Sequence, residues 1–376
     1  MNHEIELKLR LNTTELPLLE EALASLPLIQ EPTLKLLNRY FDTPEMGLSQ
    51  GGAALRIRQQ NELDEHGSVA SGQIIQTLKT RGVSTAGLHQ RMEWDWPLTE
   101  VDLDIDLIRN SEAHTYLSTS LNLASITPLF TTDFQRRVWI YQQQDSMIEI
   151  VLDQGQVETE EHSIALLELE LELKKGRPEV LFELAQIIAN TCPVVMSDIS
   201  KAERGYGLLA KSDSYKNIKK DWSGKIPHIE LDATHSVECF TTLFAYQLSV
   251  FQRSIEHSIW DNKLAQQDRV RNQLQLLENV IRLFNGIAEL PEAIKLLTMI
   301  SAAKQEPLII ALTWGKLSLL CGRWLYQLAT NAELLKASEQ QGMTTAEKSR
   351  LSQHMTQLEN NKNQLPVDTL SKGMKL

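Results

Sequence analysis

Hydrophobic and polar residues alternate with a period of two through most of the first 175 residues. HEIELKLRL at 3–11 and IALLELELELKKG at 164–176 place aliphatic side chains at every second position, with charged side chains between them. Side chains two positions apart in a strand point the same way, so this pattern predicts β-strands with one apolar and one charged face. Turn signals separate the segments, among them QGGA, DEHGS and DQGQ at 50–53, 64–68 and 153–156.

Two helical patterns interrupt these strands, and longer ones follow them. Residues 13–26 have an apolar face at helical spacing, with Thr13 or Thr14 as the N-cap, and residues 177–191 have Pro178 near the first turn. From about residue 227 the hydrophobic period becomes helical and glycine becomes rare, which predicts amphipathic helices. Short connections between these helices favour an antiparallel bundle.

The charged faces differ systematically from strand to strand. Carboxylates gather on the first and last strands, whereas arginine and lysine dominate the middle ones. Neighbouring carboxylates on one face repel by about 2 kcal/mol per pair at an effective dielectric constant near 20, a cost that solvent or a bound cation would relieve. A half-exposed strand is normally polar on its wet side, so solvent explains any single pair. The charged positions are Glu4, Glu6, Lys8, Arg56, Arg58, Lys79, Arg81, Arg91, Glu93, Asp95, Glu149, Asp153, Glu168, Glu170 and Glu172.

Taken together, these faces favour a barrel over an open sheet. About eight such strands can close around an interior that holds one small ligand, and their aliphatic outer faces then need cover from helices. The predicted fold is α+β, with a closed antiparallel eight-stranded barrel, flanking helices and a C-terminal all-α bundle. We expect the barrel domain at 1–210, a polar linker at 211–226, the helical domain at 227–362 and a tail at 363–376.

The residue types inside such a barrel indicate its ligand. Guanidinium and ammonium groups suit phosphate oxygens, and clustered glutamates suit a hard cation such as Mg²⁺ or Mn²⁺. The combination predicts a chain of phosphates that carries a divalent metal ion.

Composition and charge limit the number of domains, the class of ligand and the cellular compartment. The chain has 376 residues, enough for two domains with separate cores. Its net charge of −12 comes from the first half, and such an acidic surface disfavours nucleic acid. Three cysteines without pairing or zinc-ligand spacing indicate a reducing compartment. Charges inside the N-terminal apolar stretch argue against a signal peptide, and no uncharged apolar run reaches about 18 residues. We therefore expect a cytoplasmic protein without a membrane span.

Glu-x-Glu-x-Lys on the first strand, present as Glu4, Glu6 and Lys8, resembles the signature of the CYTH superfamily, the triphosphate tunnel metalloenzymes. The similarity covers residues 1 to about 210 and continues through YFDT, ALRIR, GLHQRMEW, TDFQRRVW, IEIVLDQG and SDISKAERGYG. Within the superfamily the chain is similar to bacterial inorganic triphosphatases, which pair this barrel with a C-terminal helical CHAD domain. The resemblance implies hydrolysis of tripolyphosphate to pyrophosphate and phosphate with a divalent metal.

We use the resemblance to assign candidate site residues. Arg136 and Arg137 point to opposite faces of a strand, and the resemblance selects Arg136. Asp153, just before Gly155, is equally well interpreted as a turn residue. Metal ligands are predicted at Glu4, Glu6, Glu168, Glu170 and Glu172, and catalytic roles at Glu168, Glu170 and Lys8. Phosphate contacts are predicted from Lys8, Arg56, Arg58, Lys79, Arg81, Arg91, Arg136 and Lys201.

The helical half departs from the CHAD pattern. QQDRVRNQLQLLENVIRLF keeps Arg269 and Val270, while Gln and Asn stand where the family has basic residues. We therefore expect a packing or assembly role, with a homo-oligomer through this domain left open. Two alternatives for the whole chain also remain. One is a class IV adenylate cyclase or an organic triphosphatase acting on thiamine or nucleoside triphosphates, and the other is a non-catalytic polyphosphate-binding scaffold.

Overall fold

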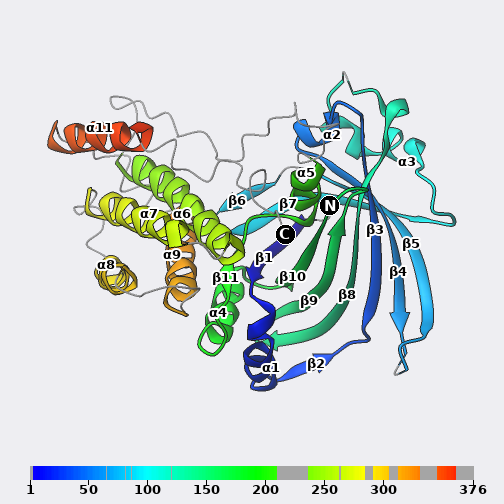
Figure 1. The fold of residues 1–376 in the computed structure, drawn as a ribbon, viewed down its shortest axis with the longest axis horizontal. Helices are drawn as coiled ribbons and strands as arrows, with labels where there is room; N and C mark the ends of the chain where they lie inside the picture. The colour runs from blue at the N-terminus through cyan, green and yellow to red at the C-terminus, as the bar shows by residue number, and fades with distance from the viewer. Residues whose placement is uncertain are drawn as a thin grey trace.

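Eight antiparallel strands close into a barrel in the N-terminal half of the computed structural model (Figure 1). The barrel order is β1 (His3–Arg10), β10 (Ser163–Lys175), β9 (Ser146–Glu158), β8 (Thr127–Gln143), β3 (Leu34–Asp42), β4 (Ala54–Leu63), β5 (Val69–Lys79) and β7 (Leu88–Leu98), and β7 pairs back with β1. The predicted closed eight-stranded barrel is therefore confirmed. The structure describes residues 3–64, 66–80, 82–85, 87–119, 121–209, 236–261, 264–283, 291–304, 312–330 and 345–360.

Three short strands extend the barrel wall. They are β2 (Leu28–Gln30) beside β8, β6 (Val83–Thr85) beside β7 and β11 (Val195–Met196) beside β1. Directly paired residues in antiparallel strands share a face. The register of β1, β10, β9 and β8 aligns Arg10, Glu168, Asp153 and Arg136 in one row, which puts their side chains on the inner face.

The expected turn at DQGQ is wrong, because these four residues lie inside β9. A side chain at Gly155 would come within 2.1 Å of the carbonyl oxygen of Asp133 on β8. The glycine therefore permits close approach of two strands rather than a turn. The turn at QGGA is confirmed: Gln50 ends the short helix α2 (Gly47–Gln50), and the turn follows at Gly51 and Gly52, where Gly52 has a φ of 78°.

Short helices cover the barrel on several sides. The first helical segment begins with the 3₁₀ turn η1 (Thr13–Glu15) and continues as α1 (Leu16–Ala24). Its cap is Asn12, whose backbone N–H donates to the Glu15 carboxylate, so the predicted threonine caps are wrong. The second predicted helix is α4 (Glu179–Ile188), with Pro178 as its N-cap. The remaining short elements are α3 (Ile105–Arg109), η2 (Glu112–Tyr116) and η3 (Leu123–Ser125).

One helix, α5 (Lys201–Leu209), packs on the inner face of the barrel wall. Tyr206 meets Phe130 edge to face with ring centroids 5.1 Å apart, and Phe130 occupies an inward position of β8. A Cβ at Gly205 would lie 2.0 Å from the Phe130 ring, so this glycine lets the helix approach. The inner face is therefore partly apolar where α5 covers it.

The C-terminal half contains five described helices: α6 (Ser236–Asp261), α7 (Leu264–Leu283), α8 (Pro291–Ala303), α9 (Leu312–Thr330) and α11 (Thr345–Asn360). One continuous apolar core joins them to the outer face of the barrel, from Leu7 and Leu169 through Phe182 of α4 to Phe240 and Trp314. Figure 1 shows α4 and β11 between the barrel and these helices. The helical half thus supplies the cover that the aliphatic outer faces require.

Two predicted segments lie outside the described residues, namely the linker at 211–226 and the tail at 363–376. The domain boundaries stay predictions. Among the described helices, none combines the length and apolar character that crossing a membrane would require.

Candidate functional site

A cavity of about 1120 Å³ runs through the barrel interior. Residues of β1, β4, β5, β7, β8, β10 and α5 line it, and α6 of the helical half adds Tyr246, Ser249, Val250 and Arg253. Among the predicted site residues, those that line it are Glu4, Glu6, Lys8, Arg56, Arg58, Lys79, Arg91, Arg136, Glu170, Glu172 and Lys201. Arg81 lies outside the described residues.

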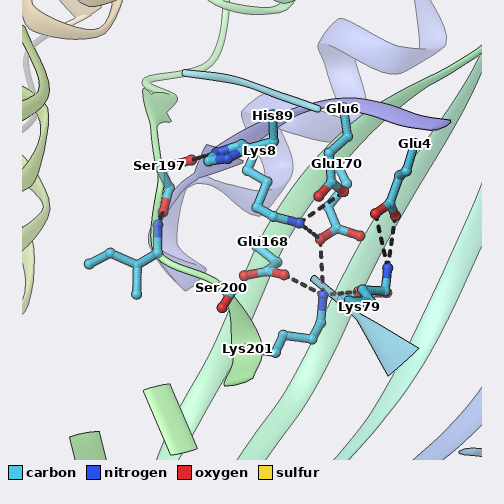
Figure 2. A network of polar contacts seen from close by, with 12 residues as sticks. Glu4, Glu6, Lys8, Lys79, His89, Glu168, Glu170, Ser197, Ser200 and Lys201 are labelled. Carbon is cyan, nitrogen blue, oxygen red and sulfur yellow. Dashed lines mark hydrogen bonds and ion pairs between the residues drawn. The ribbon is translucent and has the colours of Figure 1, made fainter. Parts of the chain in front are cut away.

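Cations separate the carboxylates at the centre of this cavity (Figure 2). Lys8 Nζ donates to Glu6 at 2.9 Å and also to Glu170. Lys201 Nζ reaches in from α5 and contacts Glu168, Glu170 at 3.2 Å and Asp153 at 2.7 Å. Lysine therefore takes the place that the sequence suggested for solvent or a bound cation, and the expected repulsion along β10 is offset.

Arg136 completes this group from β8. Its guanidinium binds both carboxylate oxygens of Asp153 at 2.7 Å and reaches Glu170 at 3.1 Å. The neighbouring Arg137 points outward and binds Glu20 of α1. The two arginines thus point to opposite faces, with Arg136 inward as the resemblance indicated.

A second charged group occupies the wall formed by β1, β5 and β7. Glu4 accepts hydrogen bonds from Lys79 at 2.9 and 3.0 Å and from Arg91 at 2.6 Å. Arg91 also binds Glu6 at 2.6 Å, and Lys79 also contacts Glu93 at 2.9 Å. Glu6 joins this group to the first, because it contacts both Arg91 and Lys8.

Electrostatic interactions in the cavity favour the charged forms. Burial raises the pKa of Glu170, but Lys201, Lys8 and Arg136 outweigh it and hold that pKa well below its usual range. Burial is likewise outweighed at Glu6 by Lys8 and Arg91, and at Asp153 by Arg136 and Lys201, so both pKa values are lowered. Glu172 differs, because burial raises its pKa despite the nearby Lys174.

Arg58 on β4 is the least compensated cation of the set. Its Nε donates to Asn38 at 2.7 Å, and no carboxylate among the described residues forms an ion pair with it. Burial, followed by the charges of Arg56 and Arg136, lowers its pKa to about 9. The charges of two other arginines thus act on this half-buried guanidinium. Such a group favours a bound anion, and the cavity that it lines has room for one.

Asp153, Glu168 and Glu170 have carboxylate oxygens within 4.8 Å of one another, and all three residues are buried. Glu168 Oε2 accepts no hydrogen bond within the part of the chain that the structure describes. Oxygen-only donors suit a hard divalent cation, so this group fits one. Of the predicted ligands, Glu168 and Glu170 belong to it, whereas Glu4, Glu6 and Glu172 line the cavity outside it.

Two residues at the site were not among the predicted ones. Asp153 is fully buried in the middle of β9, so its interpretation as a turn residue is wrong. Its place four positions from Glu149, on the same strand face, was the available signal. Asn38 is fully buried, donates to Thr132 at 2.9 Å and orients Arg58. The corresponding signal was an asparagine in the strand segment LKLLNRYFD, on the same face as Leu36 and Tyr40.

Residues 2–206 match the CYTH domain family. The chain belongs to the CYTH family. An inorganic triphosphatase of Haemophilus influenzae is 30% identical over 311 residues, which cover 81% of this chain and 81% of that relative. Because this match is longer than the CYTH region, the similarity extends into the helical half. A CHAD domain in that half stays a prediction.

Two solved structures are similar to about half of this CYTH protein. A putative adenylyl cyclase from Hippeastrum with a dominant triphosphatase activity is 22% identical, covers 54% of this chain and 96% of its own, and has a TM-score of 0.39. The PH1819 protein from Pyrococcus horikoshii is 19% identical, covers 56% of this chain and 99% of its own, and has a TM-score of 0.37.

Proposed function

We propose that this CYTH protein hydrolyses inorganic triphosphate to pyrophosphate and phosphate inside its barrel. The observation that carries the proposal is the inner wall of β4. Arg58 donates there to an amide and forms no ion pair with a carboxylate of the described residues, and Arg56 lies 3.7 Å from its carboxylate partner, Glu93. An anion with several oxygens would neutralise these two guanidinium groups and accept their hydrogen bonds. The similarity to an inorganic triphosphatase over 81% of the chain supports the same substrate.

The phosphate-binding groups proposed here are Lys8, Arg56, Arg58, Lys79, Arg81, Arg91, Arg136 and Lys201. Phosphoryl transfer asks a protein mainly for positioning and for neutralisation of charge. Lys8 and Lys201 both contact Glu170 in this structure. Phosphate oxygens that attract these lysines would therefore release Glu170 for a cation. Substrate binding and cation binding then support one another.

We propose Mg²⁺ or Mn²⁺ as that cation. Glu168 and Glu170, with Asp153 beside them, would hold it, and Glu4, Glu6 and Glu172 remain proposed ligands from the sequence. Bound there, the cation would neutralise phosphate charge and polarise the phosphoryl group under attack. Glu170 would also orient the attacking water, and Arg136 fixes the position of that carboxylate at 3.1 Å.

A cytoplasmic setting is part of the proposal. Cys192, Cys239 and Cys321 are free and buried, which fits a reducing compartment.

The direct test is phosphate release from tripolyphosphate, ATP and thiamine triphosphate, each with and without Mg²⁺ or Mn²⁺, together with an assay for cyclic AMP. We expect turnover of tripolyphosphate that depends on the cation. Arg58→Gln should weaken it, whereas Arg137→Gln, a matched change on the outer face, should not. Preferred cleavage of ATP or formation of cyclic AMP would overturn the proposal, and binding without turnover would indicate a scaffold.

A further inference from the structure

A carboxylate from the helical half reaches the wall of the barrel. Glu256 of α6 is 1% exposed, and both of its oxygens accept from Ser197 Oγ at 3.0 Å. Arg204 Nη2 of α5 donates to it at 2.9 Å, and Arg10 Nε of β1 lies 3.7 Å away. Glu256 therefore interacts with two buried arginines that belong to the barrel domain.

The same two arginines face the barrel carboxylate Glu168 from their other side. Arg10 Nη1 lies 4.0 Å from Glu168 Oε2, and Arg204 Nη2 lies 3.9 Å from the same oxygen. Arg10 and Glu168 are paired in the register of β1 and β10. Two cations thus lie between a carboxylate of the helical half and one of the proposed metal ligands.

We infer that Glu256 is a positioning residue: it holds Arg10 and Arg204 away from Glu168, so that the Glu168 carboxylate can bind a divalent cation. Glu256 holds Arg10 and Arg204 through the shorter contacts, which leaves Glu168 with the longer ones. Without the Glu256 charge, Glu168 is the carboxylate that the structure places within 4.0 Å of both arginines. The arginines would then move toward Glu168 and compete with the cation. The inference rests on the cation site of the proposed function.

This arrangement gives the helical half a part in the chemistry of the barrel. Buried ion pairs resist separation because each remaining charge would lack a partner. A contact of this kind between α6 and the barrel fixes the position of α6 and, through the two arginines, the electrostatics of the cation site.

The test compares Glu256→Gln with Glu278→Gln in the full chain. Glu278 is a matched control: it is 7% exposed, lies on α7, and binds Arg282 at 2.8 Å and also Lys304, within the helical half. Free Mn²⁺ is measured by electron paramagnetic resonance without substrate, and the melting temperature is measured in parallel. We expect Glu256→Gln to weaken Mn²⁺ binding about tenfold, and Glu278→Gln to leave it unchanged while lowering the melting temperature.

Two further variants keep the inference falsifiable if Glu256→Gln does not fold. Glu256→Asp retains the charge and should recover most of the Mn²⁺ affinity. Ser197→Ala removes the hydroxyl that donates to Glu256 and accepts from the Ile199 N–H, and it should weaken Mn²⁺ binding by about threefold. Unchanged Mn²⁺ affinity in a folded Glu256→Gln or Ser197→Ala variant overturns the inference, as does a wild-type chain that binds no Mn²⁺. A wild-type chain that binds Mn²⁺ but does not hydrolyse triphosphate refutes the proposed function and leaves this inference standing.

Discussion

The barrel cavity is lined mainly by charged side chains, whereas the core of the helical half is mainly apolar. The barrel encloses ion pairs such as Lys8 with Glu170 and Arg136 with Asp153. The helical half encloses an aromatic cluster, in which Phe240, Phe244 and Trp324 have ring centroids 5.2 to 5.5 Å apart. Buried ion pairs contribute little net stability compared with apolar packing, whereas buried aromatic rings contribute directly. The charged interior is therefore explained by function, and the apolar interior by stability.

The barrel strands show the same division on their two faces. Leu7 and Leu9 of β1 pack into the core shared with the helices, while Glu6 and Lys8 of the same strand line the cavity. The outer face thus holds the strand in place while the inner face carries charge. A change in the cavity should accordingly alter turnover most, and a change in the shared core should alter stability most.

The largest expected effect is that of Glu170→Gln on turnover. Glu170 contacts Lys8, Arg136 and Lys201 and is a proposed cation ligand. Loss of its charge should lower phosphate release from tripolyphosphate by about 10³-fold. Some stability should also be lost, because three buried cations lose a partner. Circular dichroism should still report a folded chain.

The matched control for that prediction is Glu20→Gln on the outer surface. Glu20 binds Arg137 there, and an exposed ion pair contributes at most about 1 kcal/mol. Its turnover should equal that of the wild type. Turnover of Glu170→Gln within tenfold of the wild type would mean that the central carboxylate has no chemical role.

The sequence predicted the parts of the fold that depend on local periodicity. Alternation predicted the strands, the face of Glu170 and the opposite directions of Arg136 and Arg137, because the side-chain direction in a strand follows from position alone. The charged inner faces then favoured closure into a barrel. The resemblance added the choice of Arg136 over Arg137 and the candidate phosphate contact Lys201.

The parts that the sequence did not predict depend on contacts between distant segments. No local pattern shows that α5 packs inside the barrel, because its close approach depends on Gly205 lying against Phe130 of β8. Asp153 was assigned equally to a turn because glycine two positions later is a turn signal, whereas here it permits close strand packing. The contact from Glu256 to Arg10 joins residues far apart in sequence and has no periodic signature at all.

A smaller effect is expected from Leu277→Ala in the shared core. Leu277 of α7 is fully buried, and removal of its side chain should lower the free energy of unfolding by about 3 kcal/mol. Turnover per folded molecule should not change, because the residue lies away from the cavity. Urea unfolding and phosphate release measure the two quantities.

Leu18→Ala, at an exposed leucine of α1, is the control and should change the unfolding free energy by at most about 0.5 kcal/mol. A fall in the turnover of folded Leu277→Ala would contradict the conclusion that the shared core affects stability and not turnover.

The smallest effect is expected from mild acid acting on a buried histidine of the helical half. His354 of α11 is 3% exposed, and neither ring nitrogen has a hydrogen-bond partner among the described residues. Burial lowers its pKa from 6.5 to about 4. Between these two pH values His354 is protonated in the unfolded chain and neutral in the folded chain. The free energy of unfolding is therefore unaffected by this histidine above pH 6.5 and should fall by about 2 kcal/mol between pH 7 and pH 5.

The barrel carboxylates should respond only at lower pH. The pKa values of Glu6, Asp153 and Glu170 are lowered in the folded chain, so their contribution persists until the pH falls below about 4.3, the usual value of a free glutamate. Burial also lowers the pKa of His89 on β7, so the barrel contributes to the same pH range. Urea unfolding between pH 7 and pH 5 should therefore show a slope that His354→Leu reduces and that His162→Leu, a change at an exposed histidine, retains. Equal slopes in the two variants would assign the acid sensitivity to the charged interior of the barrel instead.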